Sequence, residues 1–182
     1  MKIGTLIALS LLLIGCQPNQ KKTNGGDTNT TSTTSIAEEQ EAPKMETYFN
    51  PKFGYAIDYP VGVLFPQEES TLGDGRAFKN KEGEDALIVY ATSRTDIEAK
   101  ITSLKEEFSE TIRMYEQDSI SKITYKKLGK TFFVISGYQG KKIFYQKTVQ
   151  EEGIFVNAIL YYKESEKAFY EGYIGKIFGS IK

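Results

Sequence analysis

The stretch YKKLGKTFFVISGYQGKKIFYQKT, residues 125 to 148, decides the fold. Its apolar and aromatic runs are separated by short polar turns at Gly129-Lys130 and Gln139-Gly140. Runs of strand length joined by such short turns form hairpins, and serial hairpins form an antiparallel meander. The pattern therefore predicts three consecutive antiparallel strands, over 121–128, 131–138 and 141–150.

Strand patterns continue on both sides of this stretch. The turn Glu151-Glu152-Gly153 leads into IFVNAILYY, in which every second residue from Ile154 is apolar. Upstream, YAIDYP alternates and stops at Pro60, and two further runs flank a polar turn at 81–85. These patterns predict four more strands, over 55–60, 76–80, 86–93 and 154–162.

Two segments have the period of a helix instead. Apolar residues at spacings of three and four predict a helix over about 96–116, preceded by a capping box of Thr95 and Glu98. A second helix is expected from about Ser165, where Gly172 and Gly175 weaken it but let it lie close to the sheet. The sequence thus predicts an α+β domain, an antiparallel sheet of about six to seven strands with two packed helices.

Composition excludes several classes of function. The chain has 182 residues, a formal net charge of -1, no histidine and one cysteine. A balanced charge does not suit a nucleic-acid-binding protein. Without histidine, the commonest general base and metal ligand is missing, and one cysteine allows no intramolecular disulfide. We therefore predict no metal site and no cofactor.

The N-terminus has the order of an export signal. Lys2 precedes an apolar run over residues 3–14, which is too short to span a membrane. The run ends in Leu13-Ile14-Gly15-Cys16, which resembles the lipobox of bacterial lipoproteins. The resemblance implies that residues 1–15 are removed and that Cys16 carries the lipid anchor. The alternative to lipidation is that Cys16 is a buried free cysteine in an ordinary signal sequence.

Residues 16–46 are expected to form a tether. They are rich in Thr, Asn, Ser and Gln and have few apolar side chains, so they cannot bury enough surface to offset their ordering entropy. About 30 flexible residues reach roughly 30 Å on average. The domain would begin near residue 47. Gln17 is not the Asp used for inner-membrane retention, so the periplasmic face of the outer membrane is favoured in a cell with two membranes.

The segment GDGR, residues 73–76, is the stretch most like a binding site. Its glycines free the backbone around Asp74, and the Arg76 guanidinium could bind a carboxylate or a phosphate. The simpler interpretation is a turn, with Asp74 capping its own backbone and Arg76 solvated. Asp74 and Arg76 are the candidate contacts with a ligand or partner.

Other patterns have mainly structural explanations. The S-x-x-K spacing from Ser119 lacks the companion motifs of penicillin-interacting enzymes, and Asp118-Ser119-Ile120 matches only a short O-glycosylation pattern. The acidic pair Glu106-Glu107 is expected on a solvated helix face. Tyrosines concentrate in the C-terminal half, and we expect them to pack under helices or to form a partner surface. These tyrosines are Tyr138, Tyr145, Tyr161, Tyr162, Tyr170 and Tyr173.

Several segments together resemble one known fold. They are YFNPKFGYAIDYP (48–60), LGDGRAF (72–78), LIVY (87–90), the stretch 125–148 and FVNAILYY (155–162). These segments look like bacterial envelope domains of the PsbP-like fold, which the photosystem subunit PsbP and the yeast Ran-binding Mog protein share. Members of this group are mostly non-catalytic binding or assembly factors.

The resemblance implies a lipid-anchored, non-enzymatic envelope protein that binds another envelope protein or a small ligand. One alternative is a structural, assembly or chaperone-like factor, which would need an extended apolar patch rather than a pocket. Another is a hydrolase that uses Asp74 and a second carboxylate, because no histidine is available.

Overall fold

The computed structural model describes residues 44–95 and 102–182. The predicted signal peptide, Cys16 and the tether as far as residue 43 lie outside the described residues, as do the first turns of the predicted helix over 96–116. Residues 40–182 form a compact unit, and the buried core lies within it. Neither helix in the described ranges has the length and hydropathy of a membrane span.

The described residues of the domain form nine strands, two α-helices and a short 3-10 turn. The strands are β1 (Met45–Asn50), β2 (Tyr55–Pro60), β3 (Phe65–Glu69), β4 (Gly75–Lys79), β5 (Asp85–Ser93), β6 (Ser121–Leu128), β7 (Phe132–Gln139), β8 (Lys142–Gln150) and β9 (Ile154–Lys163). The helices are α1 (Leu104–Gln117) and α2 (Lys167–Gly179), and the 3-10 turn η1 (Glu164–Glu166) precedes α2.

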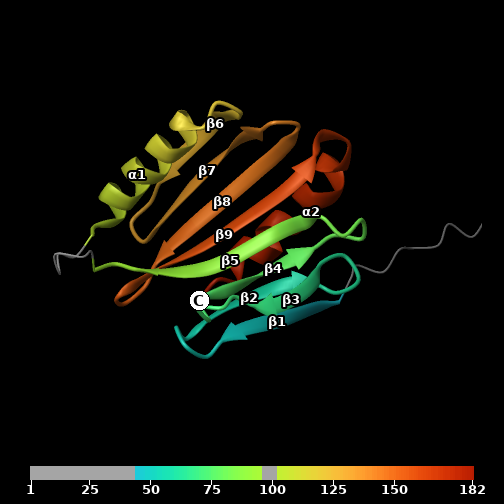
Figure 1. Cartoon of the computed structure of the whole chain (residues 1–182), viewed down its shortest axis with the longest axis horizontal. Coiled ribbons are helices and arrows are strands. Elements are labelled where there is room, and N and C mark those ends of the chain that lie inside the picture. Colours follow the sequence, from blue (N-terminus) through green and yellow to red (C-terminus); the bar gives the residue numbers. More distant parts are fainter. Residues whose placement is uncertain (1–43, 96–101) are drawn as a thin grey trace, which may run out of the picture. The chain divides into compact units, whose positions relative to one another are not determined.

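The strands form two antiparallel sheets. Seven of them follow the order β3-β4-β5-β9-β8-β7-β6, and β1 and β2 form a separate hairpin (Figure 1). The α+β class and the meander of β6 to β9 are confirmed. The membership of the sheet differs from the prediction, because β2 pairs with β1 and the unpredicted β3 forms one edge. Met45, the start of β1, precedes the expected domain boundary by two residues.

Helix α1 begins later than predicted. Its N-cap is Ser103, whose hydroxyl accepts from the Glu106 N–H at 3.2 Å, while the Glu106 carboxylate accepts from the Ser103 N–H at 2.8 Å. The predicted cap, Thr95, lies just beyond β5, and Glu98 is outside the described residues. The helix therefore spans 104–117, and its cap is the second of two S/T-x-x-E sequences.

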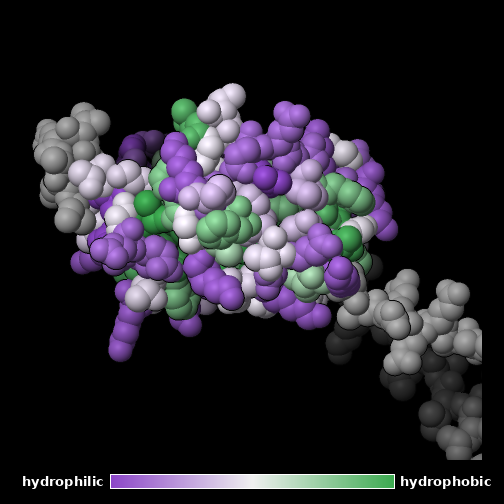
Figure 2. Space-filling view, turned by 90° about the horizontal axis from the view of Figure 1, so that it is seen from below, coloured by the Kyte–Doolittle hydropathy of each residue, from purple (hydrophilic) through white to green (hydrophobic). Residues whose placement is uncertain are grey.

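The two helices lie on opposite faces of the large sheet. Leu104 of α1 packs with Phe133 and Ile135 of β7, whereas α2 packs with β9 and with β2 of the hairpin. In Figure 1, α1 lies over the β6–β7 side of the sheet and α2 lies behind β5 and β9. On the side that carries β1 and β3, separate groups of apolar side chains lie among polar ones (Figure 2).

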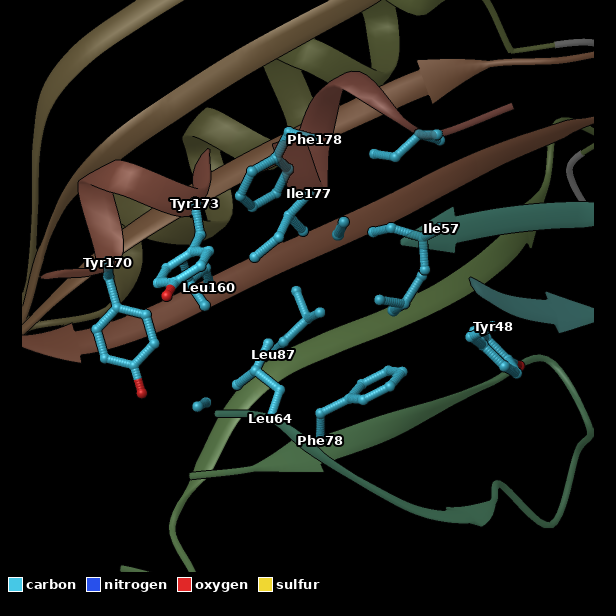
Figure 3. Packing of buried hydrophobic residues seen from close by; sticks show 14 of the residues in the cluster. Tyr48, Ile57, Leu64, Phe78, Leu87, Leu160, Tyr170, Tyr173, Ile177 and Phe178 are labelled. Carbon is cyan, nitrogen blue, oxygen red and sulfur yellow. The ribbon is translucent and has the colours of Figure 1, made fainter. Parts of the chain in front are cut away.

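The larger core lies between the sheet, α2 and the β1–β2 hairpin. Figure 3 shows Ile177 and Phe178 of α2 directed toward Leu160 and Leu87 of the sheet. The predicted face of β9, from Ile154 to Leu160, is part of this core. Gly172 and Gly175 do not serve close packing as expected, because a Cβ atom at either position would meet nothing within 4 Å.

Candidate functional site

A cleft of about 330 Å³ lies between α1 and the sheet. The elements that line it are α1 with its C-cap, β5, β7, β8 and β9. The lining residues are Tyr90, Glu107, Thr111, Met114, Tyr115, Asp118, Gln139, Gln146, Asn157, Ile159 and Tyr161. Three aromatic rings and several polar groups therefore converge on one cavity.

The cleft exists because α1 covers only part of its sheet face. The helix contacts mainly β6 and β7, where the Phe108 and Phe133 rings lie 5.2 Å apart. At its C-terminal end, the Tyr115 ring stacks on Phe144 at 4.3 Å between centroids. The same face of β9 and β5 continues beyond the helix, and Tyr90 and Tyr161 belong to that part.

A chain of buried polar side chains crosses this sheet face. The Tyr115 hydroxyl donates to Gln146 Oε1 at 2.9 Å, and Gln146 Nε2 donates to Thr148 Oγ1 at 3.1 Å. Thr148 donates to Asn157 Oδ1 at 2.8 Å, and Asn157 Nδ2 donates to Thr92 Oγ1 at 3.3 Å. Gln146, Thr148 and Asn157 are at most 3% exposed. Buried amides need such partners, and a satisfied network fixes their orientation at the cleft.

The two ionisable acids of the cleft differ. Burial, and then the neighbouring Glu110, raise the pKa of Glu107, whose carboxylate has no hydrogen-bond or ion-pair partner among the described residues. Asp118 accepts from the Ser121 hydroxyl at 2.6 Å and from Gln139 Nε2 at 2.9 Å, and these bonds lower its pKa. The sequence placed Glu107 on a solvated helix face. That expectation is wrong, because Glu107 lies partly buried at the cleft.

The tyrosines of the cleft are neutral at physiological pH. Burial is the main cause that raises the pKa of Tyr90, Tyr115 and Tyr161 above the usual value of 10.0. Their hydroxyls can donate or accept hydrogen bonds, and their rings provide apolar walls. The cleft thus combines apolar walls with hydrogen-bonding groups, and Asp118 is held by Ser121 and Gln139.

The structure places Asp74 in the turn between β3 and β4. Its backbone N–H donates to Ser70 Oγ at 3.1 Å, and the Ser70 hydroxyl donates back to the Asp74 carboxylate. The Tyr55 hydroxyl donates to the Asp74 carbonyl at 2.9 Å. The segment is thus a turn, as the simpler interpretation of GDGR expects, but the Asp74 carboxylate binds the Ser70 hydroxyl and not its own backbone.

Arg76 is not solvated, however. Its Nη2 donates to Glu69 Oε2 at 2.9 Å, and its guanidinium lies 4.4 Å from the centroid of the Tyr48 ring. Glu69 also accepts from the Tyr48 hydroxyl at 2.6 Å and from Asn50 Nδ2 at 2.8 Å. Burial acts to raise the pKa of Glu69, but these donors hold it below its usual value. Arg76 thus joins β4 to the β1–β2 hairpin.

Asp74 and Arg76 share a hollow of about 410 Å³ with Glu68 and with Tyr90, which also lines the cleft. Contact of Asp74 or Arg76 with a ligand stays a prediction. Modification of Ser119 is likewise untested. Ser119 lies in the turn after α1, whereas the S-x-x-K of penicillin-interacting enzymes begins a helix, so that spacing is a coincidence.

The predicted tyrosine cluster divides into three environments. Tyr162, Tyr170 and Tyr173 are buried under α2, where burial raises the pKa of Tyr162 and Tyr170 to about 12. Tyr161 lines the cleft, and Tyr138 is 39% exposed. The Tyr145 ring centroid lies 4.7 Å from that of Phe178 in α2, so four of the six tyrosines pack at α2, as the first of the two interpretations expects.

Comparison with known proteins gives a match of fold alone. No family model matches the chain, and no curated protein matches it. Among solved structures, it is similar to the solution structure of cyanobacterial PsbP (CyanoP) from Synechocystis sp. PCC 6803, at 13% identity and a TM-score of 0.56. The alignment covers 82% of this chain and 98% of that chain. The domain described here has the PsbP-like α+β fold.

Proposed function

We propose that this chain is a lipid-anchored protein of the bacterial cell envelope, and that its PsbP-like domain binds a small ligand in the cleft beside α1. The sequence supports the anchor through Leu13-Ile14-Gly15-Cys16 and the polar tether that follows. The fold supports a binding role only in general terms, because one fold serves many functions. The cleft is the observation that carries the proposal.

Small-molecule sites typically combine aromatic and apolar walls with a few oriented polar groups. The cleft meets this description through Tyr90, Ile159 and Tyr161 on its walls and Gln146 and Asn157 in the buried network. The network is costly for a sheet face that could be apolar, because each buried amide must be fully paired. We infer that these amides orient a ligand in the cleft.

The structural or chaperone-like alternative is less well supported. It requires a continuous exposed apolar surface. In the described part of the chain, the most exposed large apolar side chains are Leu72 in the β3–β4 turn, Met114 in α1, Ile120 in the α1–β6 turn and Phe49 in β1. The apolar groups on the side seen in Figure 2 are likewise interrupted by polar ones.

The hydrolase alternative depends on Asp74 and a second carboxylate. Glu68 shares the hollow with Asp74, but the Asp74 carboxylate accepts the Ser70 hydroxyl in its own turn. Glu69 is ion-paired with Arg76 and has a lowered pKa, which suits neither a general acid nor a free base. Asp74 and Glu69, the carboxylates nearest to the predicted site, are thus both held by their own neighbours, which argues against this alternative.

Filling the cleft tests the proposal. Thr111 is buried on the cleft side of α1, so Thr111→Phe should occupy the cavity, whereas the matched Ser109→Phe places the same ring on the exposed side of the helix. Residues 40–182 would be incubated with small-molecule extracts of bacterial envelopes and examined by native mass spectrometry. We expect one adduct on the wild type and on Ser109→Phe, and none on Thr111→Phe. An adduct that survives Thr111→Phe, or no adduct on any variant, contradicts the proposal.

A further inference from the structure

Positive charge is concentrated on one side of the domain. The segment 121–150, which comprises β6, β7 and β8, contains seven lysines and no Asp or Glu. Residues 47–182 have 19 basic and 19 acidic side chains, so the rest of the domain has 12 basic against 19 acidic. The domain is therefore neutral as a whole but strongly basic along this edge of the sheet.

Several of these lysines share a sheet face with exposed tyrosines. Register pairs Lys122 with Tyr138 and Lys127 with Val134, and an irregularity between Ile123 and Tyr125 brings Tyr125 opposite Ser136 on the same face. This face is opposite to the one that α1 covers, because α1 packs on the alternate residues of β7, including Phe133 and Ile135. Tyr125 is 50% exposed and Tyr138 is 39% exposed.

Lysines on the two neighbouring turns extend this surface. Lys130 follows β6 and Lys141 follows β7. We call the set Lys122, Tyr125, Lys127, Lys130, Tyr138 and Lys141 the lysine–tyrosine face. Its four lysines are exposed and form no ion pair within the described ranges, whereas Lys142 pairs with Glu84 at 3.0 Å.

Protection of an edge strand explains only part of this surface. Lysines on an edge strand prevent pairing with other chains, and β6 is such a strand. That purpose accounts for Lys122 and Lys127. It does not account for Lys130 and Lys141 on the turns, nor for two exposed tyrosine rings between the lysines.

We propose that the lysine–tyrosine face docks the domain on the anionic phospholipid headgroups of the membrane that carries its anchor. Lysines near an anionic bilayer each favour binding by roughly fivefold, and tyrosine rings favour the headgroup region. The choice of a membrane as the partner rests on the proposed anchor. Charge complementarity and the exposed tyrosines rest on the fold alone.

The tether is long enough for this orientation. It enters the domain at β1, which lies on the β3–β4 side of the large sheet, away from β6 (Figure 1). Seven strands spaced about 4.8 Å apart span roughly 30 Å. If the segment is flexible, as its composition predicts, its roughly 30 residues would reach that distance on average and about 100 Å when extended. The anchored chain can therefore place β6 on the bilayer.

Vesicle binding tests the proposal without the lipid anchor. The chain from residue 16 onward with Cys16→Ser would be sedimented with vesicles of phosphatidylglycerol and phosphatidylethanolamine (3:7) or of phosphatidylcholine alone, in 0.1 M salt. The test variant replaces Lys122, Lys127, Lys130 and Lys141 by Gln. The matched control replaces Lys81, Lys105, Lys176 and Lys182 by Gln, so that the net charge changes equally.

We expect the wild type and the control to bind the anionic vesicles at least 100-fold more tightly than the test variant, and none to bind phosphatidylcholine. Tyr125→Ala with Tyr138→Ala should weaken binding further. Equal binding of control and test variants, or binding of polyglutamate without binding of anionic vesicles, would overturn the proposal. Because the chain is unlipidated, a failure here is distinct from a failure of the anchor.

Discussion

Tyr115 of α1 holds the sheet in two ways at once: its ring stacks on Phe144 with an angle of 8° between the ring planes, and its hydroxyl donates to Gln146 Oε1 at 2.9 Å. The first contact secures the helix, and the second begins the polar network of the cleft. The same side chain thus joins the packing of α1 to the orientation of the buried amides.

Tyr115→Phe separates these two roles. The ring contact is kept, but Gln146 loses its donor, so we expect a loss of about 1 kcal/mol in the free energy of unfolding together with weaker ligand binding. Tyr115→Ala removes the ring as well and should cost about 3–5 kcal/mol. Urea unfolding would measure both. If Tyr115→Phe left stability and binding unchanged, the hydrogen bond would have no role in the cleft.

Glu107→Gln should stabilise the domain at neutral pH. A folded-state pKa raised above 4.5 means that the ionised form is disfavoured, so stability decreases as pH rises from the unfolded pKa through the folded one. The amide removes this loss, and we expect a higher melting temperature at pH 7 and little change at pH 4. Glu116→Gln is the control, because Glu116 is exposed on the same helix. A gain that is equal at both pH values would contradict the assignment.

The hairpins could be predicted because their determinants are local. From Ser121 to Lys163, each segment has the length of a strand and is bounded by a tight turn, and register follows from the turns. The start of α1 could not be fixed in this way. Both Thr95-x-x-Glu98 and Ser103-x-x-Glu106 match the capping box, and apolar residues at helical spacing follow each of them. The helix begins after the Ser103 capping box, where Leu104 packs against the sheet, and this tertiary contact cannot be read from the sequence.

The sequence does not predict β3 or the cleft, and the reasons differ. In β3, FPQEE has no apolar alternation and contains a proline, which an edge strand tolerates. The cleft combines residues from five elements, and no motif joins them in sequence. One signal was available: Gln146 and Asn157 lie in strands that otherwise read as buried, and buried amides require partners.

Ionisation of Glu69 should make the free energy of unfolding depend on pH in the acid range. Its pKa is below 4.5 in the folded state, so its contribution is present above the unfolded pKa and is lost as pH falls through the folded one. Glu69→Gln should therefore destabilise the domain at pH 7 and flatten the decline in melting temperature below about pH 4.5. Glu68→Gln, on the exposed alternate position of β3, should leave the decline unchanged. An identical acid profile for wild type and Glu69→Gln would refute the role of this network.

Two Gly→Ala substitutions should change the free energy of unfolding in opposite directions. A Cβ atom on Gly137 would lie 2.0 Å from the Lys122 carbonyl oxygen, so Gly137→Ala must displace β6 from β7 and should cost roughly 3 kcal/mol. Gly175→Ala on α2 meets nothing within 4 Å and should add about 0.5–1 kcal/mol through helix propensity. Chemical denaturation measures both. If Gly175→Ala destabilised the domain, another part of the protein would have to lie in contact with position 175 of α2.

Cys16→Ser tests the anchor itself. The thiol is the expected site of lipid attachment, and two or more acyl chains hold a protein on a membrane where one gives only marginal binding. We expect the variant to accumulate as an unprocessed or soluble form in cell fractionation, while the wild type sediments with membranes and is extracted by detergent. The domain should fold equally in both, because its core lies within residues 44–182. Processing and detergent extraction of Cys16→Ser identical to those of the wild type would count against lipidation. Vesicle binding by the soluble Cys16→Ser chain that is lost when Lys122, Lys127, Lys130 and Lys141 are replaced by Gln would assign the remaining affinity to the lysine–tyrosine face.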